Sequence, residues 1–314
     1  MIHICTYFDF NFLPRGLALY NSIKKFHSEF KFYVLAFDSE TYDYLINLND
    51  SRIVPVSFQT YNSFFNTSID NYEDRKQYYF SATPNICIYL LNQNPDIDIL
   101  LYLDADVYLF SSLEPLYNEF GNSSIGICPH RLHPIVKSLT KNHGIYNVGV
   151  NLFRNNSVGK KCLNDWKLEC ESWYKGKPGY YLNYFSDQIF LDKWPERYSE
   201  VKVIQHIGID VAPWNAANYK FRKENNILYV NNCPVIIYHF SALKRVSEQC
   251  WNANTIIYMA SVKSVLLEMY INYIKEVETN DRSDKFAVIQ LSKSICKRTF
   301  YWVMQLFLNE EIYR

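Results

Sequence analysis

The sequence predicts an α/β protein with a mostly parallel sheet flanked by helices, followed by a C-terminal helical extension. Apolar runs typical of strands alternate with helical spacing over residues 1–103, and that alternation indicates a doubly wound sheet. The run 99–103, Ile-Leu-Leu-Tyr-Leu, is short and uninterrupted, as a strand buried on both faces should be. From residue 251 the spacing becomes helical. We therefore expect one domain over residues 1–250 and a helical extension over 251–314.

Repeated strand–helix units fill the first third of the chain. Strands are expected over residues 2–7, 32–37 and 52–58, and helices over 16–26, from Ser39 onward and over 84–91. Pro55 confines the third strand to a sheet edge, because proline cannot donate to a strand ladder. Pro84 is expected in the first turn of its helix, where a missing N–H is tolerated. These units lead into the apolar run 99–103.

The pattern loosens after residue 106 and later turns helical. Strands are expected over 124–128, 148–153, 201–206 and 234–240, and helices over 160–174 and from 187. Residues 175–179 are expected to form a turn or a mobile loop. Helical spacing over 258–277 and 288–306 predicts two further helices. The last is basic and amphipathic, so residues 285–308 are a candidate for peripheral membrane contact. The same pattern is explained if the helix packs on the main domain or on a second subunit, as in a homodimer. We favour this packing against protein over membrane contact.

Composition excludes several classes of function. The formal net charge is zero, which gives no electrostatic reason to expect a nucleic-acid partner. None of the eight cysteines forms a Cys-x-x-Cys pair, so we expect buried thiols in a reducing compartment. No apolar run approaches the roughly 18 residues of a transmembrane helix, and no signal-peptide pattern is present. We therefore expect a cytoplasmic protein, either free or held peripherally at the inner face of the membrane.

Two aspartates, Asp104 and Asp106, follow the apolar run directly. Residues i and i+2 of a strand point to the same face, and ligands of open α/β sheets bind at the carboxyl ends of the strands. Paired carboxylates at such an end suit a hard divalent cation that carries substrate phosphates. The alternative is a strand-end turn or a helix cap. Asp96 and Asp98 have the same spacing but follow a loop, so we expect them to be solvated.

Other polar residues could join these aspartates. His239 ends the apolar run 235–238 and could complete a site for Mn²⁺ or Mg²⁺, although a lone histidine is more often structural. Lys244 follows five residues later and could neutralise a leaving phosphate. Asp187 and Gln188 open a helix, where they could cap it, bind sugar hydroxyls or hold an acceptor in place.

The order and spacing of these motifs resemble those of GT-A glycosyltransferases, close in plan to glycosyltransferase family 8 and to bacterial nucleotide-diphospho-sugar transferases. The resemblance spans about residues 1–245. Its motifs begin with Thr6–Asp9, Arg15–Leu19, Tyr78–Pro84 and Leu103–Asp106, and continue with Tyr146–Val150, Ser186–Gln188, His206, Ala212–Asn215 and Tyr238–Ser241. The fold that the resemblance implies is a Rossmann-like GT-A sheet.

The resemblance also implies roles for individual residues. Asp104, Asp106 and His239 would hold the metal on the donor diphosphate, and Lys244 would stabilise the leaving diphosphate. Thr6 and Tyr7 would face the base, and Arg75 would reach the phosphates or the sugar. Asn147 and Gly149 would lie against the transferred sugar, and Asp187 and Gln188 would lie beside the anomeric carbon or the acceptor. The lysine departs by one residue from the family spacing after the metal-binding histidine.

The function that follows from the resemblance is metal-dependent transfer of a sugar. The donor would be a nucleoside diphosphate sugar, with UDP the expected nucleotide and Mn²⁺ or Mg²⁺ the cofactor. The acceptor would be a hydroxyl of a glycan, a lipid-linked molecule or a protein, in surface polysaccharide assembly.

Two other functions stay open on the sequence alone. A sugar-nucleotide pyrophosphorylase needs a glycine-rich phosphate loop after the first strand, and here no glycine precedes Gly16. A non-catalytic glycan-binding or scaffolding protein would use some of the 27 Tyr and 21 Phe side chains for sugar stacking. The intact set of Asp104, Asp106 and His239 favours an enzyme over a scaffold.

Overall fold

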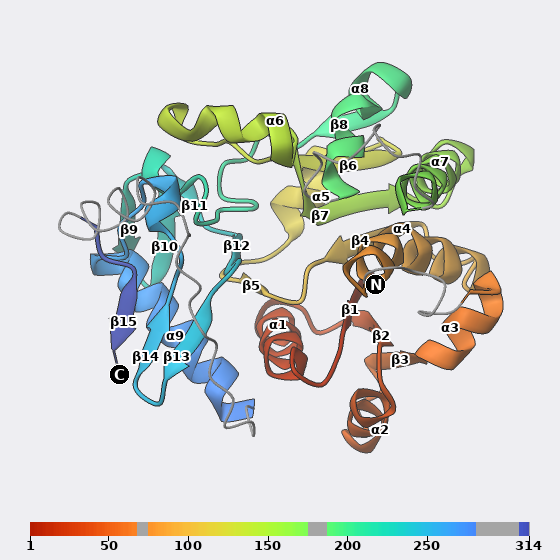
Figure 1. The fold of residues 1–314 in the computed structure, drawn as a ribbon, viewed down its shortest axis with the longest axis horizontal. Coiled ribbons are helices and arrows are strands. Elements are labelled where there is room, and N and C mark those ends of the chain that lie inside the picture. The colour runs from red at the N-terminus through yellow and green to blue at the C-terminus, as the bar shows by residue number, and fades with distance from the viewer. Residues whose placement is uncertain (68–74, 175–186, 281–307, 314) are drawn as a thin grey trace.

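The computed structural model describes residues 1–67, 75–174, 187–280 and 308–313 (Figure 1). Its centre is a seven-stranded sheet in the order β3-β2-β1-β4-β7-β6-β8. The strands are β1 (Ile2–Phe8), β2 (Phe30–Ala36), β3 (Ile53–Ser57), β4 (Ile99–Leu103), β6 (Ile125–Pro129), β7 (Tyr146–Arg154) and β8 (Val201–Val203). Only the two pairings that β7 makes, with β4 and β6, are antiparallel. The mostly parallel sheet is therefore confirmed, with β3 at its edge.

Helices cover both faces of this sheet, which explains the uninterrupted apolar run of β4. Leu101 and Leu103 of β4 belong to one core, and Leu100 and Tyr102 belong to the other. The first core packs under α1 (Leu13–Phe26), α2 (Ser39–Asn47) and α5 (Glu114–Phe120); the second packs under α3 (Phe58–Phe65), α4 (Arg75–Gln93) and α7 (Ser157–Tyr174). Because successive side chains of a strand alternate between faces, every position of β4 has to be apolar.

The helix expected over 84–91 is longer than predicted. It begins at Arg75, so Pro84 lies inside α4 and not in its first turn. Proline lacks the N–H that an interior helical position normally donates. Tyr78 and Ala82, before the proline, and Ile86, after it, are all buried in the second core, so tertiary packing keeps the helix continuous. The cap of α2 also differs: Asp38, not Ser39, accepts the Thr41 N–H, at 2.7 Å.

The strand expected over 234–240 is divided and does not belong to the central sheet. It forms β11 (Cys233–Pro234) and β12 (Ile237–His239). β12 pairs antiparallel with β5 (Val107–Leu109), which directly follows Asp106, and His239 lies opposite Val107. A hydropathy pattern identifies a buried strand but not its partner. Long-range pairing thus brings His239 to the end of β4.

The C-terminal part contains strands as well as the predicted helix. α9 (Ser264–Asn280) packs on α1, and a small sheet joins β13 (Lys244–Ser247), β14 (Cys250–Asn252) and β15 (Glu311–Tyr313). A second small sheet joins β11, β10 (Ile227–Val230) and β9 (Phe221–Glu224). The division at residue 250 stays a prediction. The short elements are α6 (Thr140–His143), α8 (Trp194–Arg197), η2 (Pro134–Leu139), η3 (Asp187–Lys193), η4 (Ala216–Asn218) and η5 (Ile256–Tyr258).

Two predicted segments lie outside the described residues. They are the turn over 175–179 and the helix over 288–306, so the membrane or subunit contact assigned to 285–308 stays a prediction. Among the helices that the structure describes, none has the length and apolar character needed to cross a bilayer.

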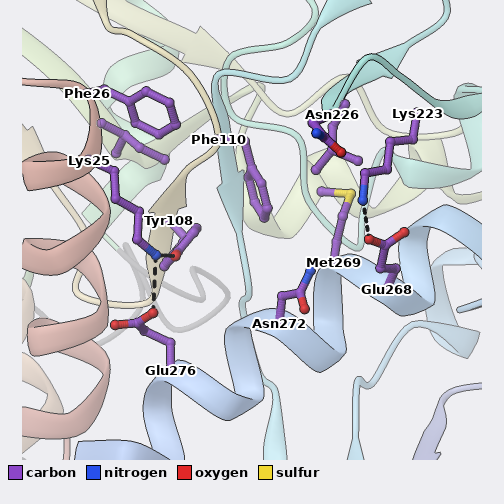
Figure 2. A pocket seen from close by; sticks show the side chains of 12 residues that line it. Lys25, Phe26, Tyr108, Phe110, Lys223, Asn226, Glu268, Met269, Asn272 and Glu276 are labelled. Atoms are coloured by element: carbon purple, nitrogen blue, oxygen red, sulfur yellow. Dashed lines mark hydrogen bonds and ion pairs between the residues drawn. The ribbon is translucent and has the colours of Figure 1, made fainter.

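A cavity of about 400 Å³ lies where α9 approaches α1 and β5 (Figure 2). Its charged lining side chains pair with one another. Lys25 Nζ lies 3.2 Å from a Glu276 carboxylate oxygen, and Lys223 pairs with Glu268. The Lys25 ammonium group also donates to the Tyr108 hydroxyl at 2.5 Å. These contacts join α9 to the main domain and leave the cavity with balanced charge.

Candidate active site

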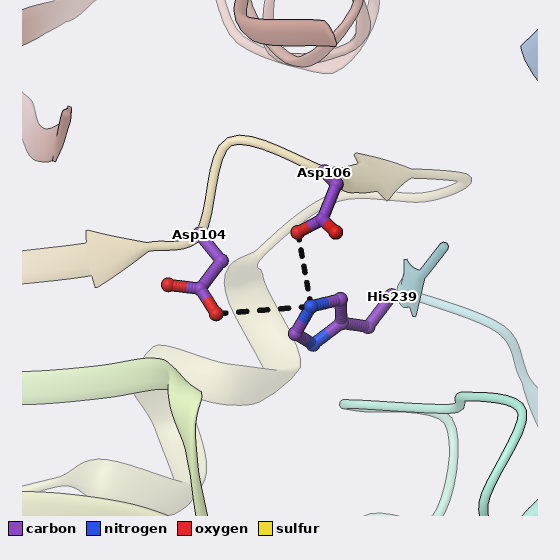
Figure 3. A group of neighbouring side chains, drawn as sticks. All are labelled: Asp104, Asp106 and His239. Carbon is purple, nitrogen blue, oxygen red and sulfur yellow. Dashed lines mark ion pairs between the residues drawn. The ribbon is translucent and has the colours of Figure 1, made fainter. Parts of the chain in front are cut away.

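Two aspartates and one histidine converge where β4 ends (Figure 3). His239 Nε2 lies 3.0 Å from Asp106 Oδ1 and 3.7 Å from Asp104 Oδ2. The other oxygen of Asp104 accepts a hydrogen bond from the Tyr102 hydroxyl at 2.7 Å. Backbone bonds fix the aspartates: the Asp104 N–H donates to the Gly149 carbonyl, and the Phe240 N–H donates to the Asp106 carbonyl.

This cluster has the chemistry of a site for a divalent cation. One ligand atom from each of Asp104, Asp106 and His239 lies within 4.8 Å of the others. Carboxylate oxygens and an imidazole nitrogen suit Mn²⁺ and Mg²⁺. His239 is buried, whereas the aspartates keep 24% and 18% of their side chains exposed. The carboxylates therefore stay open to a ligand while the imidazole is fixed behind them.

The ionisation of the cluster follows from burial and from mutual attraction. Burial raises the pKa of Asp104 to about 6, although the charge of His239 opposes the rise. Burial alone would raise the pKa of Asp106, but the charge and hydrogen bond of His239 outweigh it and hold that pKa below its usual value. Burial also lowers the pKa of His239, but the charge and hydrogen bond of Asp106 outweigh burial. The pKa of His239 is therefore raised well above its ordinary value. A cation at this site would replace that proton.

Gly149 of β7 lets the strand approach the imidazole closely. A Cβ atom at this position would lie 2.6 Å from His239 Cε1 and 2.7 Å from His239 Nδ1. Asn147 Oδ1 accepts the Gly149 N–H at 2.7 Å, and Asn147 Nδ2 donates to Gln188 Oε1 at 3.3 Å. The antiparallel strand β7 thus joins the cation cluster to η3.

Replacing Gly149 with alanine is expected to displace His239. The added methyl group overpacks the site, which costs about 1–3 kcal/mol of folding free energy, and it should weaken Mn²⁺ binding. Thermal melting and calorimetric titration with Mn²⁺ measure both effects. Val148→Ala, which changes the residue before Gly149 in β7, is the control and should leave the Mn²⁺ affinity unchanged. An unaltered affinity in Gly149→Ala would show that the close approach does not position His239.

Asp187 and Gln188 begin η3 beside Asn147. The Asp187 side chain is 1% exposed, and neither of its carboxylate oxygens has a hydrogen-bond partner among the described residues. Burial raises the pKa of Asp187 well above its usual value, and the charge of Asp104 adds to the rise. A buried carboxyl group with a raised pKa, close to a candidate cation site, is a common feature of active sites.

An aromatic cavity of about 290 Å³ opens beside the aspartates. Asp104 and Asp106 line it together with the aromatic side chains of Tyr7, Phe37 and Tyr79. The Tyr7 ring lies 5.1 Å from that of Phe37, and its hydroxyl is 3.1 Å from Thr83 Oγ1. Flat apolar rings next to a candidate cation site form a space that suits a nucleotide base.

The remaining predicted residues lie at different depths. Thr6 is fully buried in β1, whereas Lys244 is exposed at the start of β13. The Arg75 side chain lies outside the described part of the chain. Arg15, which we assigned no individual role, donates to the Leu243 carbonyl at 2.9 Å. Its charge also helps His239, against burial, to lower the pKa of Asp106.

One buried carboxylate, Asp210, was missed on the sequence. It lies 3.6 Å from His239 Nδ1 and has no exposed surface. The available signal was a single charged residue inside the apolar stretch 207–214. A charged residue is seldom buried without a partner, so the position of Asp210 in an apolar stretch predicts a partner for it. The partner is distant in sequence, which is why the local pattern did not reveal it.

Known proteins resemble this chain in both sequence and structure. Two uncharacterized proteins of Bacillus subtilis (strain 168) match it: YfnD is 22% identical, covering 87% of each chain, and YfnF is 25% identical, covering 77% of this chain and 82% of YfnF. The bifunctional glycosyltransferase WbbM matches with a TM-score of 0.50 and 13% identity, over 96% of this chain and 51% of WbbM. Galactosyltransferase LgtC, solved with donor and acceptor sugar analogues, gives a TM-score of 0.49 and 20% identity, over 77% of this chain and 87% of LgtC.

The family is shown by sequence. The model described as Glycosyl transferase family 8 matches residues 3–194, more than half of the chain. The matched span includes Asp104, Asp106 and Asp187 but ends before His239. The arrangement of the central sheet agrees with the GT-A fold that the sequence motifs implied. The chain therefore belongs to glycosyltransferase family 8, and it is a glycosyltransferase with the GT-A fold.

Proposed function

We propose that this glycosyltransferase transfers a sugar from a nucleoside diphosphate donor, with UDP the expected nucleotide, and that the transfer depends on Mn²⁺ or Mg²⁺. The observation that carries the proposal is the convergence of Asp104, Asp106 and His239 within 4.8 Å, next to the aromatic cavity. The acceptor is a hydroxyl group of a glycan, a lipid-linked molecule or a protein. The biological setting that we propose is surface polysaccharide assembly.

The residues of the site divide the work between binding and orientation. Asp104, Asp106 and His239 would hold a divalent cation, which supplies Lewis-acid stabilisation of the diphosphate leaving group when it is bound. The rings of Tyr7 and Phe37 offer flat surfaces for the nucleotide base. The donor is thereby held by its base at one end and by its diphosphate at the other.

Asp187, Gln188 and Asn147 are proposed to contact the sugar. Asn147 and Gln188 already bond to each other, so their amide groups are fixed before a sugar enters. Because burial raises the pKa of Asp187, its carboxyl group takes up a proton at a higher pH than an exposed aspartate does, and in that form it can donate a hydrogen bond to a sugar hydroxyl. Fixed polar groups of this kind orient the donor carbon towards the acceptor.

A thermal-shift experiment separates this enzyme from a non-catalytic scaffold. UDP and Mn²⁺ together should raise the Tm by more than the sum of their separate effects, because the diphosphate and the aspartates would both bind the cation. At a ligand concentration of 100 times Kd, the stabilisation would be about 2.7 kcal/mol. Asp106→Asn should abolish the joint effect. If the Tm of the wild-type protein were the same with and without UDP and Mn²⁺, the proposal would be contradicted.

A further inference from the structure

The carboxylate of Asp210 is buried behind the imidazole of His239. It lies between β8 and β9, has no exposed surface, and neither of its oxygens has a hydrogen-bond partner among the described residues. The imidazole of His239 faces it, and Nδ1 of that ring lies 3.6 Å from Asp210 Oδ1. Burying a carboxylate is costly unless another group compensates its charge. His239 is the group in position to do so.

The two nitrogens of His239 face different carboxylates. Nε2 lies 3.0 Å from Asp106 Oδ1, on the side of the cation cluster, and Nδ1 faces Asp210. The ring also has little freedom to turn. Gly149 approaches it so closely that a Cβ atom would lie 2.6 Å from Cε1, and the Trp214 ring meets it edge-on at a centroid distance of 5.1 Å. The assignment of each nitrogen to one carboxylate therefore follows from the packing.

Backbone hydrogen bonds couple the Asp210 segment to His239. The His239 N–H donates to the Val211 carbonyl at 2.7 Å. Asn215 Nδ2 donates to the Asp210 carbonyl, and Asn215 Oδ1 accepts the Ala212 N–H, each at 3.0 Å. Asp210 itself has a φ of +58°, a left-handed conformation that is uncommon for non-glycine residues, although aspartate adopts it more readily than most. The loop is thus held in the shape that presents this carboxylate.

We infer that Asp210 is a positioning residue: its carboxylate keeps the proton of the neutral imidazole on Nδ1 and leaves Nε2 of His239 free to bind a divalent cation. This inference rests on the proposed cation site. A neutral imidazole carries its proton on one nitrogen and a lone pair on the other, and only the lone pair can bind a metal. Histidines that bind metals usually donate their second N–H to a carboxylate or a carbonyl, and that partner fixes the tautomer.

Mn²⁺ affinity, measured without any donor, tests the role of Asp210. Electron paramagnetic resonance detects free Mn²⁺ and yields Kd for the wild type, Asp210→Asn and His239→Gln. Asp210→Asn should bind Mn²⁺ about 10- to 100-fold more weakly than the wild type. Asp50→Asn is the matched control, because Asp50 pairs with Arg52 next to the edge strand β3 and should not change the affinity.

A second measurement reads the tautomer in the wild-type protein itself. Nitrogen-15 NMR of the wild-type protein in Mg²⁺ reports which ring nitrogen of His239 carries the proton, and the spectrum of His239→Gln assigns the signals. We expect a protonated Nδ1 and an unprotonated Nε2. A proton on Nε2, or equal Mn²⁺ affinities of wild type and Asp210→Asn alongside weaker binding by His239→Gln, overturns the positioning role and leaves the proposed function intact. Absence of Mn²⁺ binding by the wild type overturns both.

Discussion

Replacing Asp106 with asparagine is expected to lower sugar-nucleotide turnover about 100-fold or more, which corresponds to about 2.7 kcal/mol of transition-state stabilisation. The change removes a carboxylate from the cation cluster and also the partner that His239 Nε2 approaches at 3.0 Å. A divalent cation typically supplies several kcal/mol of charge stabilisation to a departing phosphate. Initial rates of nucleoside diphosphate release, measured in saturating Mn²⁺, give the effect.

Asp96→Asn is the matched control for this prediction. Asp96 and Asp98 repeat the spacing of Asp104 and Asp106, but both are exposed before β4, as the sequence predicted. Asp98 pairs there with Arg154 at 2.7 Å. Asp96→Asn should therefore keep the wild-type rate. If Asp106→Asn also kept it, the end of β4 would not be the site of the reaction.

Replacing Asp187 with asparagine is expected to stabilise the protein while it abolishes activity. The carboxylate of Asp187 is buried without a hydrogen-bond partner among the described residues. Burying such a group costs free energy whether it stays ionised or has to take up a proton, so its removal should raise the free energy of unfolding by roughly 1–3 kcal/mol. Turnover should fall because the acid that we propose to contact the sugar is lost. Urea denaturation and initial rates, both at pH 8, measure the two opposite effects.

The gain from Asp187→Asn should depend on pH in a defined direction. The pKa of Asp187 is raised in the folded protein, chiefly by burial. The free energy of unfolding of the wild type is therefore lowered by the full amount at any pH above the folded pKa. The penalty disappears as pH falls towards the unfolded value of about 3.9, where both states are protonated. The advantage of the variant should therefore shrink from pH 8 towards pH 4. An advantage that grew on acidification would contradict a raised pKa of Asp187 in the folded protein.

Asp192→Asn, in the same element η3, is the control for stability. The Asp192 carboxylate accepts the Ile145 N–H at 2.6 Å, and an asparagine oxygen can accept the same bond. This variant should change the unfolding free energy by less than about 0.5 kcal/mol. Comparison of the two variants separates the burial of a carboxyl group without a hydrogen-bond partner among the described residues from a general effect of amidation in η3.

The sequence allowed the central sheet and the grouping of Asp104, Asp106 and His239 to be predicted, because both leave local signals. The apolar run of β4 is dictated by two covered faces, and the two aspartates mark its carboxyl end. His239 was identified as the end of an apolar run, and Gly149 and Asn147 came from the family resemblance. These residues lie in short patterns whose physical meaning depends on few neighbours.

Other features depend on partners far along the chain, and the sequence did not predict them. The antiparallel pairing of β12 with β5 sets the position of His239. The apolar pattern of residues 234–240 predicts a strand, but it would be the same whichever strand lay beside it. Asp210 has meaning only beside His239. Pro84 signals a helix start locally, but the packing of Tyr78 and Ile86 keeps α4 continuous across it. In each case tertiary contact outweighs the local preference.

The central claim is that transfer takes place at a cation site formed by Asp104, Asp106 and His239. A panel of UDP-sugars and other sugar nucleotides, incubated with the wild-type protein in Mn²⁺ and again after treatment with EDTA, tests it most directly. The account predicts that at least one donor is turned over in Mn²⁺. It also predicts that chelation lowers this rate about 100-fold and that added Mn²⁺ restores it in the wild type but not in Asp106→Asn. Turnover that persisted unchanged after removal of the metal would contradict the account.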